Sequence, residues 1–139
     1  MNNDLQLSTD EIVILVVSSH VQLRNHYSKI LTSLNATVIT VSDGFEALAL
    51  MRNTKVMAIL SDFRIPGMNG LELFLRIKEL LCNIPFVICC DRISVRARDE
   101  ALKIGVLKVL TKPSNKAMIC ETLVEAIEER HRQILQFFC

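Results

Sequence analysis

The sequence predicts an α/β domain in which one parallel sheet of five strands lies between two layers of helices. Five short apolar runs occupy residues 12–17, 36–41, 57–62, 85–90 and 106–111. Each run is shorter than a typical helix and lacks strict alternation of polar and apolar residues, which favours strands buried on both faces. The segments between the runs carry apolar residues at helical spacing. Strands that alternate with helices predict parallel pairing through right-handed crossovers.

Five apolar stripes at three- and four-residue spacing predict the helices. They consist of Leu23, Tyr27, Ile30, Leu31 and Leu34; Ala47, Leu48, Leu50 and Met51; Leu71, Phe74, Leu75, Ile77 and Leu81; Val95, Ala101, Leu102 and Ile104; and Ile119, Leu123, Val124 and Ile127. Turn and cap residues agree with these boundaries. They are Asp43-Gly44 after the second strand, Asn69-Gly70 at the third helix, Gly105 at the end of the fourth, and Pro113-Ser114 at the start of the last.

Composition narrows the classes of function. The chain has 139 residues, is half hydrophobic and carries a net charge of +1, so it is long enough for one domain with a real core. That charge gives no reason to expect direct binding of nucleic acid or of a membrane surface. No apolar stretch reaches the length of a bilayer span and no signal peptide is visible, so we expect a cytoplasmic protein. Five cysteines without metal spacing predict reduced thiols. Adjacent Cys89 and Cys90 should point to opposite faces of their strand.

The predicted strand ends bring a small set of polar side chains together. In a parallel sheet the carboxyl ends meet at one edge, where open α/β folds bind their ligands. The residues there are Ser18 and Ser19, Asp62, Cys89, Cys90 and Asp91, and Thr111 and Lys112. Asp62 closes an apolar run and precedes a turn that is rich in proline and glycine. One carboxylate therefore stands where a metal-assisted phosphate site would need several.

The order and spacing of five segments resemble the receiver domain of two-component response regulators. The segments are ILVVSSH, VSDGFEAL, SDFRIPGMNGLEL, IPFVICCD and ALKIGVLKVLTKP. The resemblance implies a flavodoxin-like (βα)5 three-layer sandwich with strand order 2-1-3-4-5. It also implies a division of the chain into an N-terminal extension at 1–10, a receiver domain at 11–130 and a helical extension at 131–139. That last segment is expected to lead into a downstream segment or partner.

The resemblance assigns roles to three positions of the phosphoryl site. Asp62 matches the aspartate that accepts a phosphoryl group from a sensor histidine kinase or another phosphodonor. Lys112 matches the lysine that contacts the phosphoryl oxygens, and its bond to Pro113 is expected to be cis. The backbone carbonyl of Arg64 matches a neutral metal ligand.

Three departures from the family pattern lower the expected activity. Ser18 and Ser19 stand where receivers carry the acidic pair that holds Mg²⁺. Cys90 replaces the serine or threonine that contacts the phosphoryl group, and Val109 replaces the aromatic residue of the switch. Mg²⁺ prefers carboxylate oxygens, and phosphoryl transfer depends on neutralisation of charge by the metal. We therefore expect weak Mg²⁺ binding and slow or absent phosphotransfer.

Two questions stay open at the level of the sequence. Asp91 either supplies the missing metal carboxylate or, as we favour, caps the following helix near Ser94.

For the whole domain, the leading hypothesis is a non-enzymatic receiver that signals through protein contacts. The alternative is a functional phosphoacceptor at Asp62, and the distant alternative is an enzyme on a flavodoxin-like fold. That third reading has little support because no glycine-rich loop follows the first strand.

Partners are expected at one side of the domain. In receivers the fourth helix, fifth strand and fifth helix form the common surface for output domains and dimers. Here the fourth helix and its preceding loop are basic, with Arg92, Arg96, Arg98 and Lys103. We expect a downstream output protein or domain, or a second copy, on this face.

Overall fold

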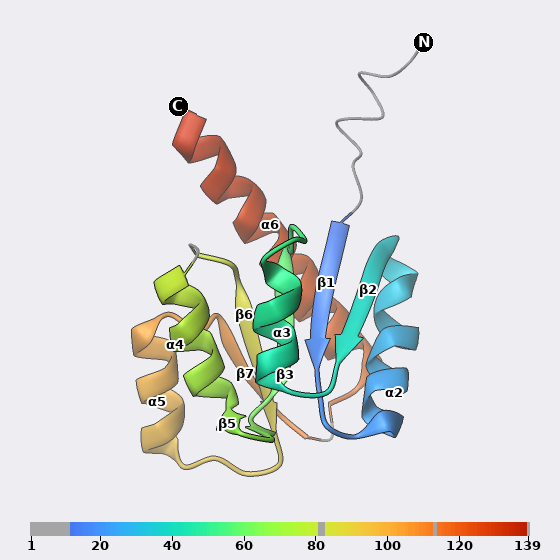
Figure 1. Ribbon diagram of the computed structural model, residues 1–139, viewed down its shortest axis with the longest axis vertical. Helices are drawn as coiled ribbons and strands as arrows, with labels where there is room; N and C mark the ends of the chain where they lie inside the picture. The colour runs from blue at the N-terminus through green and yellow to red at the C-terminus, as the bar shows by residue number, and fades with distance from the viewer. Residues whose placement is uncertain (1–11, 81–82, 113, 139) are drawn as a thin grey trace.

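Five strands form one parallel sheet within the part of the chain that the computed structural model describes, residues 12–80, 83–112 and 114–138 (Figure 1). They are β1 (Ile12–Val17), β2 (Ala36–Val41), β3 (Ala58–Asp62), β6 (Phe86–Cys90) and β7 (Lys108–Thr111). Their order is β2-β1-β3-β6-β7, which is the expected order 2-1-3-4-5. Every neighbouring pair is parallel. The predicted fold class and strand order are therefore confirmed.

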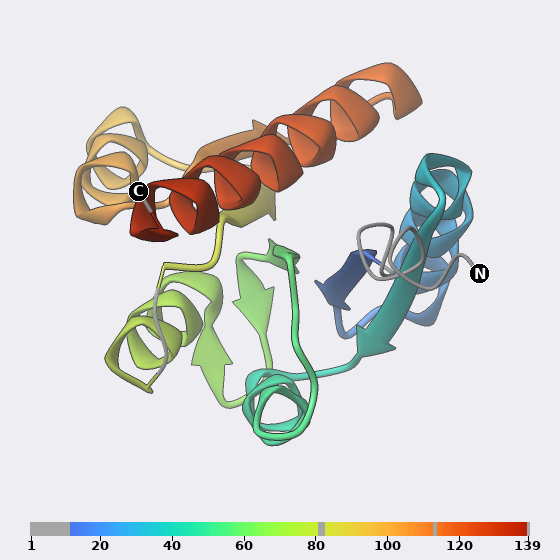
Figure 2. The same ribbon diagram turned by 90° about the horizontal axis from the view of Figure 1, so that it is seen from above.

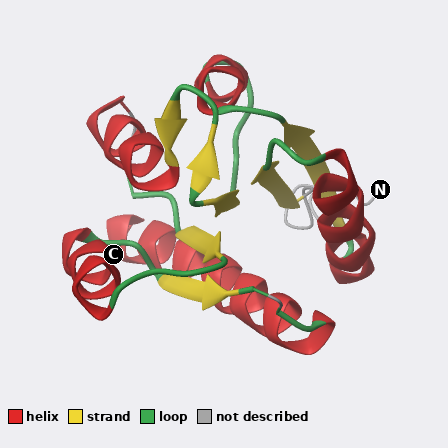
Figure 3. Cartoon of the chain, turned by 90° about the horizontal axis from the view of Figure 1, so that it is seen from below, coloured by secondary structure: helices red, strands yellow, loops and turns green. Residues whose placement is uncertain are grey.

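Helices cover both faces of this sheet, as Figure 2 shows from above and Figure 3 from below. One layer contains α2 (Val21–Leu31) and α6 (Lys116–Phe138), and the other contains α3 (Gly44–Met51), α4 (Gly70–Leu80) and α5 (Val95–Ile104). A short 3₁₀ helix, η1 (Thr32–Leu34), links α2 to β2. None of the described helices is long and apolar enough to cross a membrane.

The sheet separates two hydrophobic cores. Ile14, Leu60 and Leu123 belong to the core under α2 and α6, whereas Leu15, Ile59 and Phe86 belong to the core under α3, α4 and α5. Alternation along a strand sends successive side chains to opposite faces. Cys89 accordingly lies in the first core and Cys90 in the second. The prediction that these two cysteines point apart is confirmed, and both are free thiols.

Local hydrogen bonds fix where the helices begin. Asp43 caps α3 by accepting the Glu46 amide over 2.8 Å, and the Glu46 carboxylate accepts the Ser42 amide over 2.7 Å. At the start of α4 the bonds are reciprocal, because Asn69 accepts the Glu72 amide over 2.8 Å and Glu72 accepts the Asn69 amide over 2.9 Å. Such side-chain caps satisfy amides that the start of a helix leaves free.

The last helix begins later than the sequence suggested. It starts at Lys116, and Asn115 Oδ1 accepts the Met118 amide over 2.8 Å. The start assigned to Pro113-Ser114 was therefore too early, because an asparagine side chain supplies the cap. Pro113 lies outside the described residues, and so does the expected cis bond.

A short β-hairpin, with strands of two residues each, follows Asp62 and was not predicted. Its strands are β4 (Arg64–Ile65) and β5 (Met68–Asn69), paired antiparallel. Gly67 provides the turn with a φ of 81°, a conformation that suits glycine. Gly70 then donates its amide to the Phe63 carbonyl over 2.7 Å. The hairpin thus closes the loop next to the strand tips.

Candidate functional site

Asp62 occupies the carboxyl end of the central strand, β3. Its neighbours in the sheet are β1 on one side and β6 on the other, and all these strands end at the lower edge in Figure 1. Ser18 directly follows β1 and Lys112 directly follows β7. Asp62 is only 2% exposed and Ser18 is fully buried. The structure therefore brings these three side chains together at one edge of the sheet.

Both carboxylate oxygens of Asp62 have a partner within this group. Ser18 Oγ donates a hydrogen bond to Asp62 Oδ2 over 2.5 Å. Lys112 Nζ lies 2.9 Å from Asp62 Oδ1. Among the described residues, Oδ1 accepts no hydrogen bond of good geometry, so the contact with Lys112 is an ion pair rather than a directional bond. One negative and one positive charge thus balance at the site.

The Ser18 hydroxyl is held in one orientation. While its proton goes to Asp62, its oxygen accepts the His20 amide over 3.2 Å. A hydroxyl has one proton to donate, so that proton is fully used. The turn itself is fixed from α2, because Arg24 Nη1 donates to the Ser18 carbonyl over 2.8 Å. Sequence reasoning missed Arg24, although its position four residues after His20 places it one turn into α2.

Cys90 of β6, which stands at the expected hydroxyl position, directs its thiol to β7. Cys90 is buried, and its Sγ lies 3.7 Å from the Leu110 carbonyl on β7. Burial raises the pKa of the Cys90 thiol, so the group is neutral at pH 7. The backbone at this point still holds Lys112, whose amide donates to the Cys90 carbonyl over 2.7 Å. Cys90 therefore positions Lys112 through its backbone.

The switch position is part of the core. Val109 is 3% exposed and packs with the residues under α3, α4 and α5. Its carbonyl accepts a hydrogen bond from Arg98 Nη2 of α5 over 3.0 Å. Arg98 therefore ties α5 to β7, a contact that the sequence did not reveal.

Asp91 does not cap α5, so that prediction was wrong. The cap is Ser94, whose Oγ accepts the Ala97 amide over 3.0 Å, while Asp91 lies exposed in the preceding loop. A serine that directly precedes the helix has the reach that Asp91 lacks. Among residues 12–80, 83–112 and 114–138, no cluster of three or more His, Cys, Asp or Glu side chains could hold a metal ion. Ser19 is half-buried, and Arg64 is exposed in β4 opposite Asn69.

A buried pair lies on the other face of the sheet beneath the same edge. Tyr27 of α2 and Cys89 of β6 are 4% and 0% exposed. Burial raises the pKa of the Cys89 thiol to about 12, although the contact with Tyr27 lowers it in part. Burial also pushes the pKa of Tyr27 far above its usual range. Both groups are therefore neutral at pH 7. Nothing in the sequence pattern distinguished them from ordinary core residues.

Comparison with known proteins places this geometry in a family. A family model described as the response regulator receiver domain matches residues 14–124. The chain is 31% identical over 99 residues to the transcriptional regulatory protein GlrR of Escherichia coli K12, and this match covers 71% of this chain and 22% of GlrR. It is 30% identical over 116 residues to the sensor histidine kinase RcsC of Salmonella typhimurium, which covers 84% and 12% respectively. The chain thus spans only a small part of each relative's length.

Solved structures share the fold. The signal receiver domain of a putative Luxo repressor protein from Vibrio parahaemolyticus superposes with a TM-score of 0.86 at 18% identity, over 91% of this chain and 97% of that one. A CheY-like receiver domain from Methanospirillum hungatei gives 0.83 at 22% identity, over 89% and 99%. The family match covers well over half of the chain, and the strand order agrees with it. The chain belongs to the response regulator receiver domain family of two-component signal transduction.

Proposed function

We propose that this receiver domain signals through protein contacts and that the site around Asp62 is a degenerate phosphoacceptor site, which binds Mg²⁺ weakly at best. One observation carries the proposal: Ser18 and Lys112 engage both oxygens of Asp62 in a buried position. A carboxylate that is hydrogen-bonded and ion-paired needs no further cation to neutralise it. The domain then acts as a signalling module rather than as an enzyme.

The donor set does not fit Mg²⁺. This ion prefers oxygen ligands in octahedral geometry and is usually bound by carboxylates plus phosphate. Asp62 is the carboxylate in place, whereas Ser18 and Ser19 contribute neutral hydroxyl groups. A cation at Oδ2 would have to share that oxygen with the 2.5 Å bond from Ser18. Asp91 or the Arg64 carbonyl would have to supply the rest of the coordination, and both residues are exposed.

The contacts around the switch position support a fixed rather than a switchable state. In the receiver pattern a hydroxyl and an aromatic side chain respond together to the phosphoryl group. Here Cys90 contacts the Leu110 carbonyl and Arg98 holds the Val109 carbonyl. Both bonds join β7 to its neighbours without involving Asp62. A module of this kind presents one conformation to its partner, whether or not a phosphodonor is present.

The surface formed by α5, β7 and α6 is the proposed place for that partner. A hollow of about 390 Å³ lies there, and its lining includes Leu102, Lys108, Met118 and Glu125. Leu102 and Met118 are 41% and 48% exposed, which suits contact with a protein. We expect a downstream output protein or domain on this face, or a second copy of the chain. The reduced thiols of Cys89, Cys90 and Cys120 support a cytoplasmic setting.

A second function is favoured by one contact. Lys112 Nζ lies 2.9 Å from Asp62, which is the pairing that a phosphoacceptor requires. A domain that accepts a phosphoryl group from a sensor histidine kinase or a small phosphodonor is therefore the alternative. It would have to tolerate the serine pair at positions 18 and 19.

Phosphorylation separates the two functions. The full chain is incubated with acetyl phosphate and MgCl₂, and intact mass is followed beside Asp62→Asn and the double variant Ser18→Asp/Ser19→Asp. We expect no adduct on the wild type and an adduct on the double variant, because the acidic pair restores the Mg²⁺ ligands. An adduct on the wild type that is lost in Asp62→Asn would overturn the proposal and establish the alternative.

A further inference from the structure

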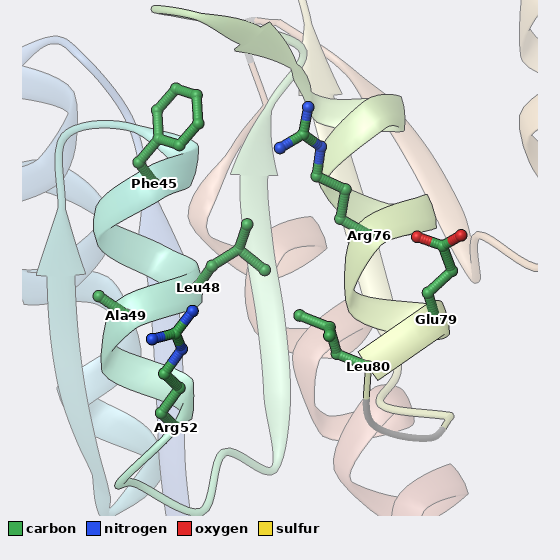
Figure 4. Close-up of a pocket in the computed structure, with 7 residues that line it drawn as sticks. All are labelled: Phe45, Leu48, Ala49, Arg52, Arg76, Glu79 and Leu80. Carbon is green, nitrogen blue, oxygen red and sulfur yellow. The ribbon is translucent and has the colours of Figure 1, made fainter.

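A second surface feature lies between α3 and α4, away from the α5–β7–α6 face. It is a groove of about 480 Å³, open to solvent, and Figure 4 shows its walls. It is lined by Phe45 and Leu48 of α3 and by Arg52, which directly follows that helix. From α4 it is lined by Arg76, Glu79 and Leu80. Leu48 and Leu80 extend from the two helices toward each other across it (Figure 4). Neither the phosphoacceptor site nor the proposed output surface uses these residues.

The groove exposes large apolar side chains that a solitary domain has no reason to leave in water. Phe45 is 54% exposed and Leu80 is 62% exposed. Each costs free energy in proportion to its apolar area in contact with water. Apolar groups gathered in a concave surface with a charged rim are typical of contact sites. The groove therefore has the composition of a docking surface.

Phe45 is held in place before any partner arrives. On one side its ring packs against Gly67, where an added Cβ would lie 2.6 Å from Phe45 Cε2. On another side the guanidinium of Arg76 lies 5.9 Å from the ring centroid, within the range of a cation–π contact. A fixed aromatic ring beside an arginine binds with little loss of side-chain entropy. Phe45 and Arg76 thus form a preorganised anchor.

The charge of the groove selects what it binds. Arg52 and Arg76 contribute two positive charges against one negative charge from Glu79. Within the described part of the chain, neither arginine has a carboxylate within 4.0 Å. A second copy docked by the same groove would bring these arginines against one another, because a two-fold interface pairs each patch with itself. A partner that carries carboxylates beside its apolar residues is complementary instead.

We propose that the α3–α4 groove binds an amphipathic helix of a partner protein, with an apolar stripe against Phe45, Leu48 and Leu80 and carboxylates that pair with Arg52 and Arg76. Two neighbouring helices that line the groove with Leu48 and Leu80 suit a third helix laid between them. This inference does not depend on Asp62 or on its phosphorylation.

The test uses a defined probe with the full chain. The probe is a fluorescein-labelled helical peptide of about 15 residues, with leucine at three- and four-residue spacing and glutamate on both flanks. A matched peptide carries lysine in place of every glutamate. Binding is measured by fluorescence anisotropy for the wild type, Phe45→Ala and Arg52→Glu/Arg76→Glu. Leu135→Ala serves as the control, because Leu135 is 64% exposed on α6. Circular dichroism verifies that each variant is folded.

We expect the wild type to bind the glutamate peptide at least about tenfold more tightly than the lysine peptide. Arg52→Glu/Arg76→Glu should reverse that preference, Phe45→Ala should weaken binding about tenfold, and Leu135→Ala should change nothing. Equal binding of the two peptides, or full binding by Phe45→Ala, would overturn the proposal. Sedimentation equilibrium tests whether a second copy of the chain occupies the groove instead. A dimer of the wild type that is lost in Phe45→Ala would assign the groove to a second copy and would also overturn the proposal.

Discussion

Substituting Ser18 with aspartate tests how the buried site at Asp62 is stabilised. The Ser18 hydroxyl lies 2.5 Å from Asp62 Oδ2 and is fully buried. A carboxylate in its place would face Asp62 at roughly 4 Å. Two like charges at that distance repel by about 4 kcal/mol at an effective dielectric constant near 20. Such a loss is a large share of the total stability of a small domain.

Urea unfolding at pH 7 in EDTA measures this loss directly. We expect Ser18→Asp to lower the free energy of unfolding by about 4 kcal/mol, and Ser19→Asp, at a half-buried neighbour, to lower it by less than half as much. Added MgCl₂ should leave the wild type unchanged. It should restore about 2.7 kcal/mol to Ser18→Asp at a concentration one hundred times the dissociation constant, since a bound cation stabilises only the folded state.

The pH dependence of the same variant has a definite sign. Repulsion raises the pKa of one of the two carboxyl groups in the folded state above its unfolded value. The folded state then binds more protons, so the deficit of Ser18→Asp relative to the wild type should shrink as the pH falls from 7 to 5. If Ser18→Asp is as stable as the wild type in EDTA at pH 7, the two carboxylates do not converge and the reasoning about this site is refuted.

Three further predictions concern the supports of the site. Gly70→Ala should lower the free energy of unfolding in urea by more than about 2 kcal/mol, because the added Cβ would lie 2.7 Å from the Asp62 carbonyl oxygen. An unchanged free energy of unfolding would mean that the backbone at Gly70 shifts without cost. Cys89 has a raised folded pKa of about 12, so its stabilising effect is complete below the unfolded value near 9 and is lost as the pH rises toward 12. The wild type should lose up to about 1.4 kcal/mol per pH unit there, and Cys89→Ala should show a shallower slope in urea unfolding at pH 8 to 11; equal slopes would exclude the thiol. Arg98→Ala should lower stability by about 1 kcal/mol through the lost bond to the Val109 carbonyl, measured by thermal unfolding, and an unchanged Tm would show that α5 is not tied to β7 in this way.

The strands were predictable because burial on both faces leaves a plain signal in the sequence. Continuous runs of Val, Ile and Leu mark β1 and β3 to within one residue. The run at 106–111 extended too far toward the N-terminus, since β7 begins at Lys108. Val106 is apolar because its side chain is buried in the core under α3, α4 and α5, while its amide bonds to the Ala101 carbonyl over 3.0 Å and closes the end of α5 behind Gly105. In the sequence, a buried apolar residue just after a helix cannot be distinguished from the first residue of the strand that follows.

The site was predictable only as far as topology determines it. Parallel strands fix which residues share an edge, so the convergence of Ser18, Asp62 and Lys112 follows from the order of the runs. The bonds from Arg24 to Ser18 and from Arg98 to Val109 depend on how long side chains reach across tertiary contacts. Local pattern carries no information on that reach. The misplaced cap at Asp91 has a similar origin, because two acceptors near a helix start compete and only geometry decides.

Cys89 and Cys90 sit back to back on one strand, with a thiol in each of the two cores. The two thiols are therefore adjacent in the sequence but lie in separate layers, and each can report on the opening of its own layer. A thiol reagent reaches each group only when its own layer opens. Labelling rates at the two positions, measured by peptide mass, would tell whether the α2–α6 layer and the α3–α4–α5 layer open together or one at a time.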